Sequence, residues 1–280
     1  MERRDEYRRL YDLCPRKSTA YSFGTLWSWR GVRDFRWAFD DGLCWIRAGN
    51  QLWSPVGPWE EVPWEEVLPR HFPDGAKFLF APDGFAEVLA RSLGPSVVCI
   101  EDRDQWEYIH SVQELTALKG NRFSRKRSHI QQFVKKHPFT YRSIRERDAE
   151  PLLECQRLWM AEHAPSPQLE MENEAIGEML AQWRNIPGLL GGLLDVGGRV
   201  VAYTVAEVLS SDTIMIHFEK ALLAYNGAYQ AINRMFLAND CASFSTVNRE
   251  EDLGEQGMRV AKMSYNPIGF LRKYIVTWTP

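Results

Sequence analysis

A histidine and a glutamate lie two positions apart in the predicted strand 213–220 (TIMIHFEK), in which apolar and polar residues alternate. Side chains two positions apart in a strand point to the same face, so His217 and Glu219 are expected to be neighbours. A carboxylate beside an imidazole at a strand end could accept and relay a proton as a general base. The same pair could instead be partly buried polar residues that tie neighbouring loops together.

A second polar segment, NREEDLGEQGMR, follows at residues 248–259. Five of seven consecutive positions are ionisable: Arg249, Glu250, Glu251, Asp252 and Glu255. One interpretation is structural, because Asp252 followed by Glu255 resembles a capping box, and Arg259 follows Glu255 at the spacing of a helical ion pair. The other interpretation is functional, with these charges gathered around a polar substrate or an amine.

Positive charge is concentrated in residues 122–136, which hold six cations and no acid: Arg122, Arg125, Lys126, Arg127, Lys135 and Lys136. The whole chain has a net charge of −3; residues 1–137 carry 21 basic and 19 acidic residues, and residues 138–280 carry 13 and 18. A local basic patch on a mildly acidic protein attracts anions to one place. The segment is therefore either a solvated helix face or a site for phosphate on tRNA, a lipid headgroup or a nucleotide.

Other familiar catalytic signatures are missing from the sequence. Between Lys220 and Arg234 there is one glycine and no cation, whereas a loop that binds the phosphates of coenzyme A before a helix is basic and rich in glycine. The histidines and the five scattered cysteines have no metal-ligand spacing, and we expect no metal. Cysteines that are odd in number and lack CxxC spacing also favour a reducing compartment.

The composition is that of a folded protein, with 45% hydrophobic and 25% charged residues among 280. This length suits two domains or one large one. No run approaches the ~18 apolar residues of a membrane helix, and the first residues, MERRDEYRRL, are charged where a secretory signal is apolar. We therefore expect a cytoplasmic protein without a membrane-spanning segment.

The elements that must position these residues are predicted from hydrophobic periodicity. Tryptophans every eight residues, from Trp29 to Trp53, predict a meander of short antiparallel strands. Helices and strands then alternate up to two helices within residues 112–136. From Phe139 onward, the predicted order is strand, two helices, three strands, helix, strand, helix and strand. This order resembles that of the N-acetyltransferase (GNAT) fold.

The first half of the chain can be interpreted in the same way. We therefore predict an α/β (α+β) protein of two tandem GNAT units, each with a central mixed sheet flanked by helices. The predicted units are residues 1–137, which end in the basic helix, and residues 138–280, which carry the polar segments.

Five segments resemble, in the right order, the catalytic domain of phosphatidylglycerol lysyltransferases, the DUF2156 family: LKGNRFSRKRSHIQQF (118–133), IHFEKA (216–221), GAYQAIN (227–233), NREEDLG (248–254) and GMRVAKMSYNP (257–267). The resemblance covers roughly residues 75–280. It implies a tandem GNAT fold and kinship with aminoacyl-tRNA-dependent transferases. Membrane-bound members move a lysyl or alanyl group from aminoacyl-tRNA to the glycerol hydroxyl of phosphatidylglycerol. This sequence contains no membrane-spanning half, which leaves its acceptor open.

The resemblance also implies roles for particular residues. Glu219, with His217, would accept the proton of the nucleophile. Asp252 and Glu251 would hold the ammonium of an aminoacyl donor. Cations that would bind phosphate or stabilise an oxyanion are Arg259, Lys262, Lys220, Arg249, Arg125, Lys126 and Arg127. Asn248 and Tyr265 complete the predicted substrate-binding set.

We therefore expect an acyltransferase without a cofactor, with aminoacyl-tRNA or acyl-coenzyme A as donor and an anionic lipid headgroup or a small amine as acceptor. If Glu219 is the base, it should lie near Asp252 and Arg259 in a cleft between the units. One alternative is a coenzyme A-dependent N-acyltransferase that acts on a small amine. Another is a non-catalytic module of the same fold that binds tRNA or a lipid headgroup.

Overall fold

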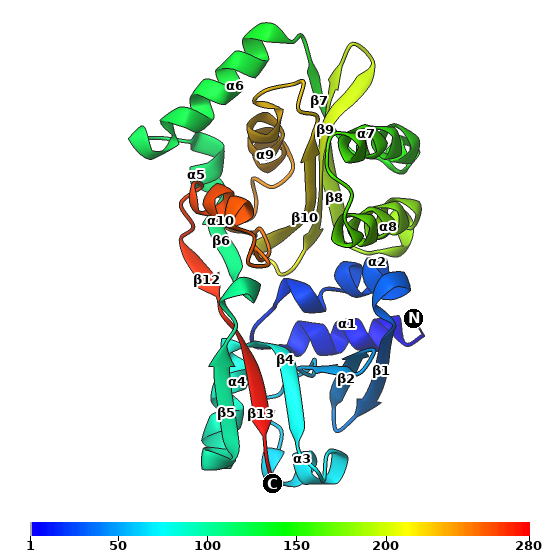
Figure 1. Ribbon diagram of the computed structural model, residues 1–280, viewed down its shortest axis with the longest axis vertical. Helices are drawn as coiled ribbons and strands as arrows, with labels where there is room; N and C mark the ends of the chain where they lie inside the picture. Colours follow the sequence, from blue (N-terminus) through cyan, green and yellow to red (C-terminus); the bar gives the residue numbers. More distant parts are fainter. Residues whose placement is uncertain (1) are drawn as a thin grey trace. The chain divides into compact units, whose positions relative to one another are not determined.

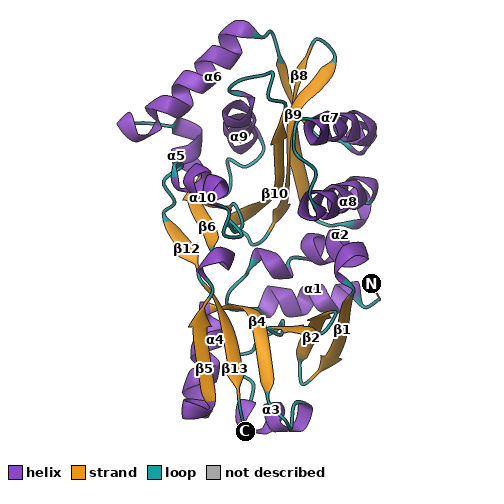
Figure 2. Cartoon of the chain, viewed as in Figure 1, coloured by secondary structure: helices purple, strands orange, loops and turns teal. Residues whose placement is uncertain are grey.

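The structure is a computed structural model that describes residues 2–280, and the chain divides into two compact units. Unit 1 is built from three stretches: Met1–Tyr108, Glu251–Arg259 and Phe270–Pro280. Unit 2 is built from two: Ile109–Glu250 and Val260–Gly269. Each unit is organised around one mixed β-sheet, whose strands are labelled in Figure 1 and coloured orange in Figure 2.

The sheet of unit 1 has six strands in the order β1-β2-β3-β4-β13-β5. The strands are β1 (Phe35–Asp40), β2 (Leu43–Ala48), β3 (Gln51–Trp53), β4 (Ala76–Pro82), β5 (Val97–Glu101) and β13 (Lys273–Trp278). Neighbouring strands are antiparallel except β3 and β4, which are parallel. The helices are α1 (Arg4–Leu13), α2 (Phe23–Arg33), α3 (Trp64–His71) and α4 (Asp83–Leu93).

The predicted tryptophan meander is present in β1 to β3, but the prediction is wrong for Trp29. This residue lies in α2, which begins where the side chain of Ser22 accepts a hydrogen bond from the backbone N–H of Thr25. The sequence-based prediction also did not include helix α1, which buries Tyr7 and Tyr11, four residues apart. A spacing of eight residues is close to two helical turns as well as to one strand and its turn, so it does not distinguish the two.

The second sheet has seven strands in the order β12-β6-β11-β10-β9-β8-β7, with β10 and β11 parallel. The strands are β6 (Glu107–Ser111), β7 (Thr140–Ser143), β8 (Leu189–Val196), β9 (Arg199–Val208), β10 (Thr213–Ala221), β11 (Thr246–Asn248) and β12 (Gly269–Leu271). The helices are α5 (Val112–Ala117), α6 (Ser124–Lys136), α7 (Ala149–Ala161), α8 (Pro167–Ala181), α9 (Ala228–Asn239) and α10 (Gln256–Met263). Figure 1 shows α9 on one face of this sheet and α7 and α8 on the other. None of the helices within residues 2–280 is both long and apolar enough to cross a membrane.

Two features hold the basic helix α6 in place: its apolar face, and a glycine before α9 that allows the two helices to approach closely. Ile130 and Phe133, three residues apart, are buried in the core of unit 2, where α6 packs on α9. Gly227, just before α9, has a φ of 91°, and a Cβ atom there would lie 2.1 Å from the backbone oxygen of His129. Only glycine therefore allows α9 to begin so close to α6.

The predicted α/β architecture of two mixed sheets flanked by helices is confirmed, and the order of elements after Phe139 is the predicted one as far as α10. The single strand predicted at the end is two strands, β12 in the second sheet and β13 in the sheet of unit 1. The boundaries of the compact units differ from the predicted boundary after residue 137. Strand β6 pairs with β11, and α5 and α6 pack on α9, so residues 109–137 group with unit 2. The division into repeats 1–137 and 138–280 rests on element order rather than compactness, and it stays a prediction.

Candidate functional site

Strand β10 contains a β-bulge at the predicted histidine. Its pairing with β9 shifts register between Ile216 and Phe218, which makes His217 the inserted residue. A bulge of this kind redirects a side chain and interrupts strict alternation. His217 and Glu219 consequently have different partners, although both lie in the predicted strand.

His217 is buried between two carboxylates. Its Nε2 atom lies 2.9 Å from Glu207 Oε2, and its Nδ1 atom lies 3.6 Å from Glu250 Oε1. Burial lowers the pKa of His217, but these carboxylates more than reverse the effect and raise it to about 9. His217 is therefore an imidazolium at neutral pH, a state that cannot act as a general base.

Glu219 is held near the end of β10 by two hydrogen-bond donors. Asn233 of α9 donates from Nδ2 to Oε2 at 2.8 Å, and Arg249 donates from Nη2 to Oε1 at 3.0 Å. Each carboxylate oxygen thus accepts one hydrogen bond here and has capacity for another. The side chain is 10% exposed, and the carboxylate is fixed in place. Asn233 is missing from the predicted site, although it belongs to the segment GAYQAIN.

Two cations from distant segments contact the ring of Tyr265. The guanidinium carbon of Arg249 lies 4.5 Å from the ring centroid, and Lys126 Nζ of α6 lies 3.9 Å from it, both within cation–π distance. Lys126 Nζ also donates to Ser264 Oγ at 2.6 Å. Tyr265 is buried, which raises its pKa. We call Lys126, Arg249, Ser264 and Tyr265 the cation cluster.

The cation cluster has unused capacity for an anion. The described contacts of Lys126 are with a hydroxyl and a ring rather than a carboxylate. Burial and the nearby charges of Arg249 and Arg125 lower the pKa of Lys126 to about 8. Arg249 Nη1 is buried and has no hydrogen-bond partner within residues 2–280. An anion placed here would compensate the charge of Lys126, since Arg249 is already paired with Glu219.

The other predicted cations in and just before α6 differ from Lys126. Arg127 donates to two backbone oxygens at the end of α5, so it completes the connection between the two helices. Arg122 pairs with Glu114 of α5 at 2.6 Å, which supplies an acid that residues 122–136 do not contain. Arg125 is exposed.

The loop after β11 is held from both sides. The Asn248 side chain accepts a hydrogen bond from the backbone N–H of Glu250 at 2.9 Å, and Glu250 has a φ of 56°. Lys262 Nζ donates to the backbone oxygen of Arg249 at 2.6 Å. Together with the ion pair between His217 and Glu250, these contacts fix the backbone that presents Arg249 to Glu219.

Lys220, next to Glu219, points to another set of partners. It donates to Glu172 of α8 at 2.7 Å, and its Nζ lies 4.0 Å from the ring centroid of Trp159. Trp159 in turn donates from Nε1 to Tyr229 at 2.7 Å. Lys220 is buried with its charge already paired, which indicates a structural tie between β10, α7 and α8.

Asp252 is the centre of a saturated network in unit 1. Arg259 donates to both of its oxygens, at 2.8 and 3.0 Å, and Arg103 donates at 3.1 Å. The hydroxyl of Tyr108 and the backbone N–H of Gly254 add two further donors. Burial raises the pKa of Asp252, but these donors hold it well below its usual range. A carboxylate has about four acceptor positions, so no oxygen of Asp252 is left for an ammonium.

The predicted helix-capping pattern is wrong in its partners. Arg259 pairs with Asp252 and Asp104 rather than with Glu255. The carboxylate of Asp252 accepts from Gly254 instead of from the backbone of Glu255. The spacing of Glu255 and Arg259 allows a local ion pair. Arg259 pairs with the two aspartates instead, because their carboxylate oxygens match the two N–H directions of its guanidinium.

A buried ion pair next to Glu251 is absent from the sequence-based prediction. Lys273 and Glu107 are both fully buried and 2.8 Å apart, and Glu251 lies 3.6 Å from Lys273 Nζ. Ser18 donates to Glu107 at 2.6 Å. The signal for this pair is one charged residue at the start of each of two apolar strands, EYIHS and KYIVTW. Glu251 therefore has a structural partner in unit 1.

The predicted residues form two groups. Glu219 and the cation cluster belong to unit 2, and Asp252 with Arg259 belongs to unit 1. That the two groups meet in one cleft stays a prediction.

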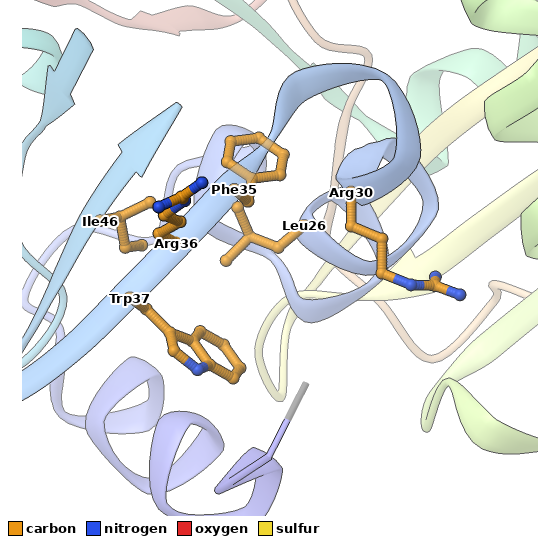
Figure 3. A pocket seen from close by; sticks show the side chains of 6 residues that line it. All are labelled: Leu26, Arg30, Phe35, Arg36, Trp37 and Ile46. Carbon is orange, nitrogen blue, oxygen red and sulfur yellow. The ribbon is translucent and has the colours of Figure 1, made fainter. Parts of the chain in front are cut away.

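Two hollows lie along β1, at the edge of the sheet in unit 1. One has a volume of about 450 Å³, and Figure 3 shows the side chains that line it: Leu26, Arg30, Phe35, Arg36, Trp37 and Ile46. The other has a volume of about 630 Å³ and extends over β2 to the end of α3. Neither is lined by a predicted site residue.

Within residues 2–280, one group of side chains has the spacing of metal ligands: Asp40, Asp41 and His71. His71 Nε2 lies 2.6 Å from Asp41, and Arg70 donates to the other oxygen of the same carboxylate. A guanidinium in this position competes with a metal ion, so ion pairing accounts for the group.

Comparisons with known proteins agree with this architecture. Residues 11–277 match the family model described as phosphatidylglycerol lysyltransferase, C-terminal. A conserved protein of unknown function from Bacteroides thetaiotaomicron is 29% identical, with a TM-score of 0.88 over 98% of this chain and 97% of its own. A search of curated proteins found no match.

Two solved structures of lower identity share the fold. The C-terminal domain (DUF2156) attributed to a lysylphosphatidylglycerol synthetase from Agrobacterium fabrum is 12% identical, with a TM-score of 0.66 over 98% of this chain and 91% of its own. L-PGS from Bacillus licheniformis is 13% identical, with a TM-score of 0.60 over 88% of this chain and 84% of its own.

Proposed function

The chain belongs to the family of phosphatidylglycerol lysyltransferase C-terminal domains, and on this premise we propose that it transfers an aminoacyl group from aminoacyl-tRNA to a hydroxyl or amine acceptor. The observation that carries the proposal is Glu219, a carboxylate fixed by Arg249 and Asn233 with acceptor capacity to spare. This donor would be met in the cytoplasm.

The proposed reaction is acyl transfer with Glu219 as general base. The acceptor O–H or N–H gives its proton to Glu219 while its oxygen or nitrogen attacks the ester carbonyl of the donor. The carbonyl oxygen becomes an oxyanion, and the unpartnered Nη1 of Arg249 is a donor suited to it. Collapse of the intermediate breaks the ester bond, and the departing ribose oxygen takes up the proton.

The cation cluster is the proposed site for a phosphate of the donor. Lys126 and Arg249 are cations held against one aromatic ring, and the described contacts of Lys126 include no carboxylate. This replaces the predicted phosphate site of three consecutive α6 residues, because Arg127 is engaged with backbone oxygens.

Other predicted roles change accordingly. Asp252 and Arg259 are proposed as positioning residues, since their charges neutralise each other within unit 1. Glu251 is proposed to steady Lys273 rather than to hold an ammonium. Lys262 acts through the backbone of Arg249, and Lys220 through α8.

The connection between β10 and α9, where coenzyme A would bind, favours aminoacyl-tRNA over acyl-coenzyme A as the donor. No cation lies between Lys220 and Arg234, and the first residues after β10 are the apolar pair Leu222 and Leu223. Gly227 is packed against the backbone of α6. A pyrophosphate would find neither charge nor an open glycine loop at this helix start.

The test is product analysis with competing donors. The full chain is incubated with a pool of charged tRNAs or with mixed acyl-coenzyme A, in the presence of anionic lipids and small amines, and products are identified by mass spectrometry. Aminoacylated product that forms only with charged tRNA and disappears in Glu219→Gln is expected. Acylated product formed only with acyl-coenzyme A would contradict the donor, and no product with either donor would support a binding module.

A matched control variant distinguishes the loss of Glu219 from the loss of one negative charge elsewhere in unit 2. Glu174 is an exposed glutamate on α8, so Glu174→Gln removes the same charge from unit 2 without touching Glu219. This variant should retain full product formation.

A further inference from the structure

Strand β1 forms one edge of the sheet in unit 1, and no strand within residues 2–280 pairs with its outer side (Figure 1). Its even-numbered residues direct their backbone groups to β2, a pattern that begins where Gly49 donates to the backbone oxygen of Asp34. Successive residues of a strand alternate in this direction, so the N–H and C=O groups of Phe35, Trp37 and Phe39 face outwards. This edge therefore offers a row of backbone hydrogen bonds to a further strand.

A hollow lies beside this edge on each face of the sheet. The odd-numbered residues of β1 belong to the face covered by α1, because the ring of Trp37 stacks on Tyr7 at 4.9 Å, and the hollow of about 450 Å³ in Figure 3 lies there. The even-numbered residues share the other face with their β2 partners Trp45 and Arg47, where the hollow of about 630 Å³ extends to Phe72. Alternate side chains of an added strand would enter the two hollows.

The order of side chains along β1 is complementary to itself. When two copies pair about a two-fold axis, their outward-facing residues must lie opposite each other, and an axis at Ala38 meets this condition. Trp37 of each copy then faces Phe39 of the other, and each such pair exchanges two hydrogen bonds. In the same register, Arg36 of each copy lies opposite Asp40 of the other. Both charges are on the same face, because an axis perpendicular to the sheet keeps each face on its own side.

The two charged side chains are available for this pairing. Arg36 and Asp40 are 78% and 67% exposed. Their ion pairs within unit 1 are long, 3.5 Å from Arg36 to Asp34 and 3.8 Å from Asp40 to His71. Arg36 also lies directly opposite Arg47 of β2, an arrangement in which like charges repel each other. An aspartate supplied from the outer side would compensate this repulsion.

The other edge of the same sheet has no such complementarity. This edge is β5, with the sequence VVCIE, which contains one acidic residue and no cation. A two-fold pairing centred on Cys99 would place Glu101 opposite Val97, so no ion pair would fix the register. The charges therefore favour β1 as the edge that a second copy recognises.

We propose that two copies of the chain pair along β1, antiparallel about a two-fold axis at Ala38, and join their unit 1 sheets into one continuous sheet. Two ion pairs between Arg36 and Asp40 set the register. Two contacts between Trp37 and Phe39 cover aromatic side chains that are half-buried in a single copy. This surface contains no residue of the proposed reaction, so the pairing holds whether or not the chain transfers aminoacyl groups.

The experiment measures self-association of the full chain by sedimentation equilibrium. Arg36→Asp and Asp40→Arg are each expected to weaken the dimer by about tenfold or more, because each change places two pairs of like charges opposite each other. The exchanged variant Arg36→Asp/Asp40→Arg restores both ion pairs and should return the affinity to within about threefold of the native chain. An equal mixture of the two single variants should form mixed dimers, detected by native mass spectrometry, since opposite charges then meet again.

Glu101→Arg and Arg91→Asp are the matched controls. They make the same charge reversals at exposed residues of β5 and α4, away from β1. Both should leave the dimer unchanged. A chain that stays monomeric at every soluble concentration would overturn the proposal and leave this edge to another partner. A dimer that the single variants leave intact, single variants that form no mixed dimer, or an equal loss in the controls would overturn it as well.

Discussion

Glu219 in unit 2 and Asp252 in unit 1 are both carboxylates bound by arginine, yet their surroundings differ. Asp252 is fully buried and accepts hydrogen bonds from Arg259, Arg103, a tyrosine hydroxyl and a backbone N–H. Glu219 accepts one hydrogen bond on each oxygen and is 10% exposed. A saturated carboxylate stabilises the fold, whereas a fixed but unsaturated one is available for proton transfer.

The sharpest test of this comparison is Glu219→Gln. Turnover should fall by roughly 10²–10⁴-fold, the contribution of a positioned general base. The glutamine can accept from only one of Arg249 and Asn233, because its other terminal atom is an N–H donor, so the free energy of unfolding should fall by about 1–3 kcal/mol. Turnover is followed by product formation and stability by urea unfolding. Near-native turnover in the folded variant would exclude Glu219 from the mechanism.

The opposite pattern is expected for Asp252→Asn. Removing this charge leaves Arg103 without its carboxylate and Arg259 with Asp104 alone, which should lower the free energy of unfolding by about 3 kcal/mol. Tryptophan fluorescence suits this measurement, because all but Trp159 and Trp183 of the eleven tryptophans belong to unit 1. Asp104→Asn, with a half-exposed side chain, should cost about 1 kcal/mol or less. Equal losses of stability in Asp252→Asn and Glu219→Gln would remove the distinction between saturated and open carboxylates.

His217 predicts how stability depends on pH. Its folded pKa of about 9 is above the ordinary value of 6.5, so its contribution is complete below pH 6.5 and is lost as the pH rises to about 9. The loss is up to about 3 kcal/mol. Urea unfolding between pH 6 and 10 measures it, and His217→Gln should flatten the curve. A variant that keeps the wild-type pH dependence would show that another group is responsible.

The smallest effect concerns Lys126. With a pKa of about 8, it is about half protonated at pH 8, and a bound phosphate should draw up to about half a proton onto it. Calorimetric titration of inorganic phosphate in two buffers of different ionisation enthalpy measures this uptake. Lys126→Met should abolish it and weaken binding by about tenfold. The exposed Lys135 of the same helix serves as the control; an equal loss in Lys135→Met would mean general attraction to α6.

The sequence was sufficient to locate the elements but not all of their contacts. Alternation in residues 213–220 correctly predicts strand β10 and the segment that holds Glu219. The bulge at His217 depends on pairing with β9, which the strand's own pattern does not encode. Likewise, the partners of Asp252 include Arg103, almost 150 residues away in the chain. The number of hydrogen-bond donors around a carboxylate depends on tertiary contacts. This number distinguishes the structural role of Asp252 from the proposed catalytic role of Glu219.

The position of β13 has a consequence for biosynthesis. This strand lies between β4 and β5 and pairs with both, so the sheet of unit 1 stays divided until residues 273–278 have been made. Synthesis of residues 109–269 takes roughly 10–30 s at about 5–20 residues per second. During this time β4 and β5 each expose an unpaired edge, which is a template for association with other chains. The nascent protein is therefore expected to depend on chaperones during the synthesis of its second unit, when most of its tryptophan-rich first unit is already present.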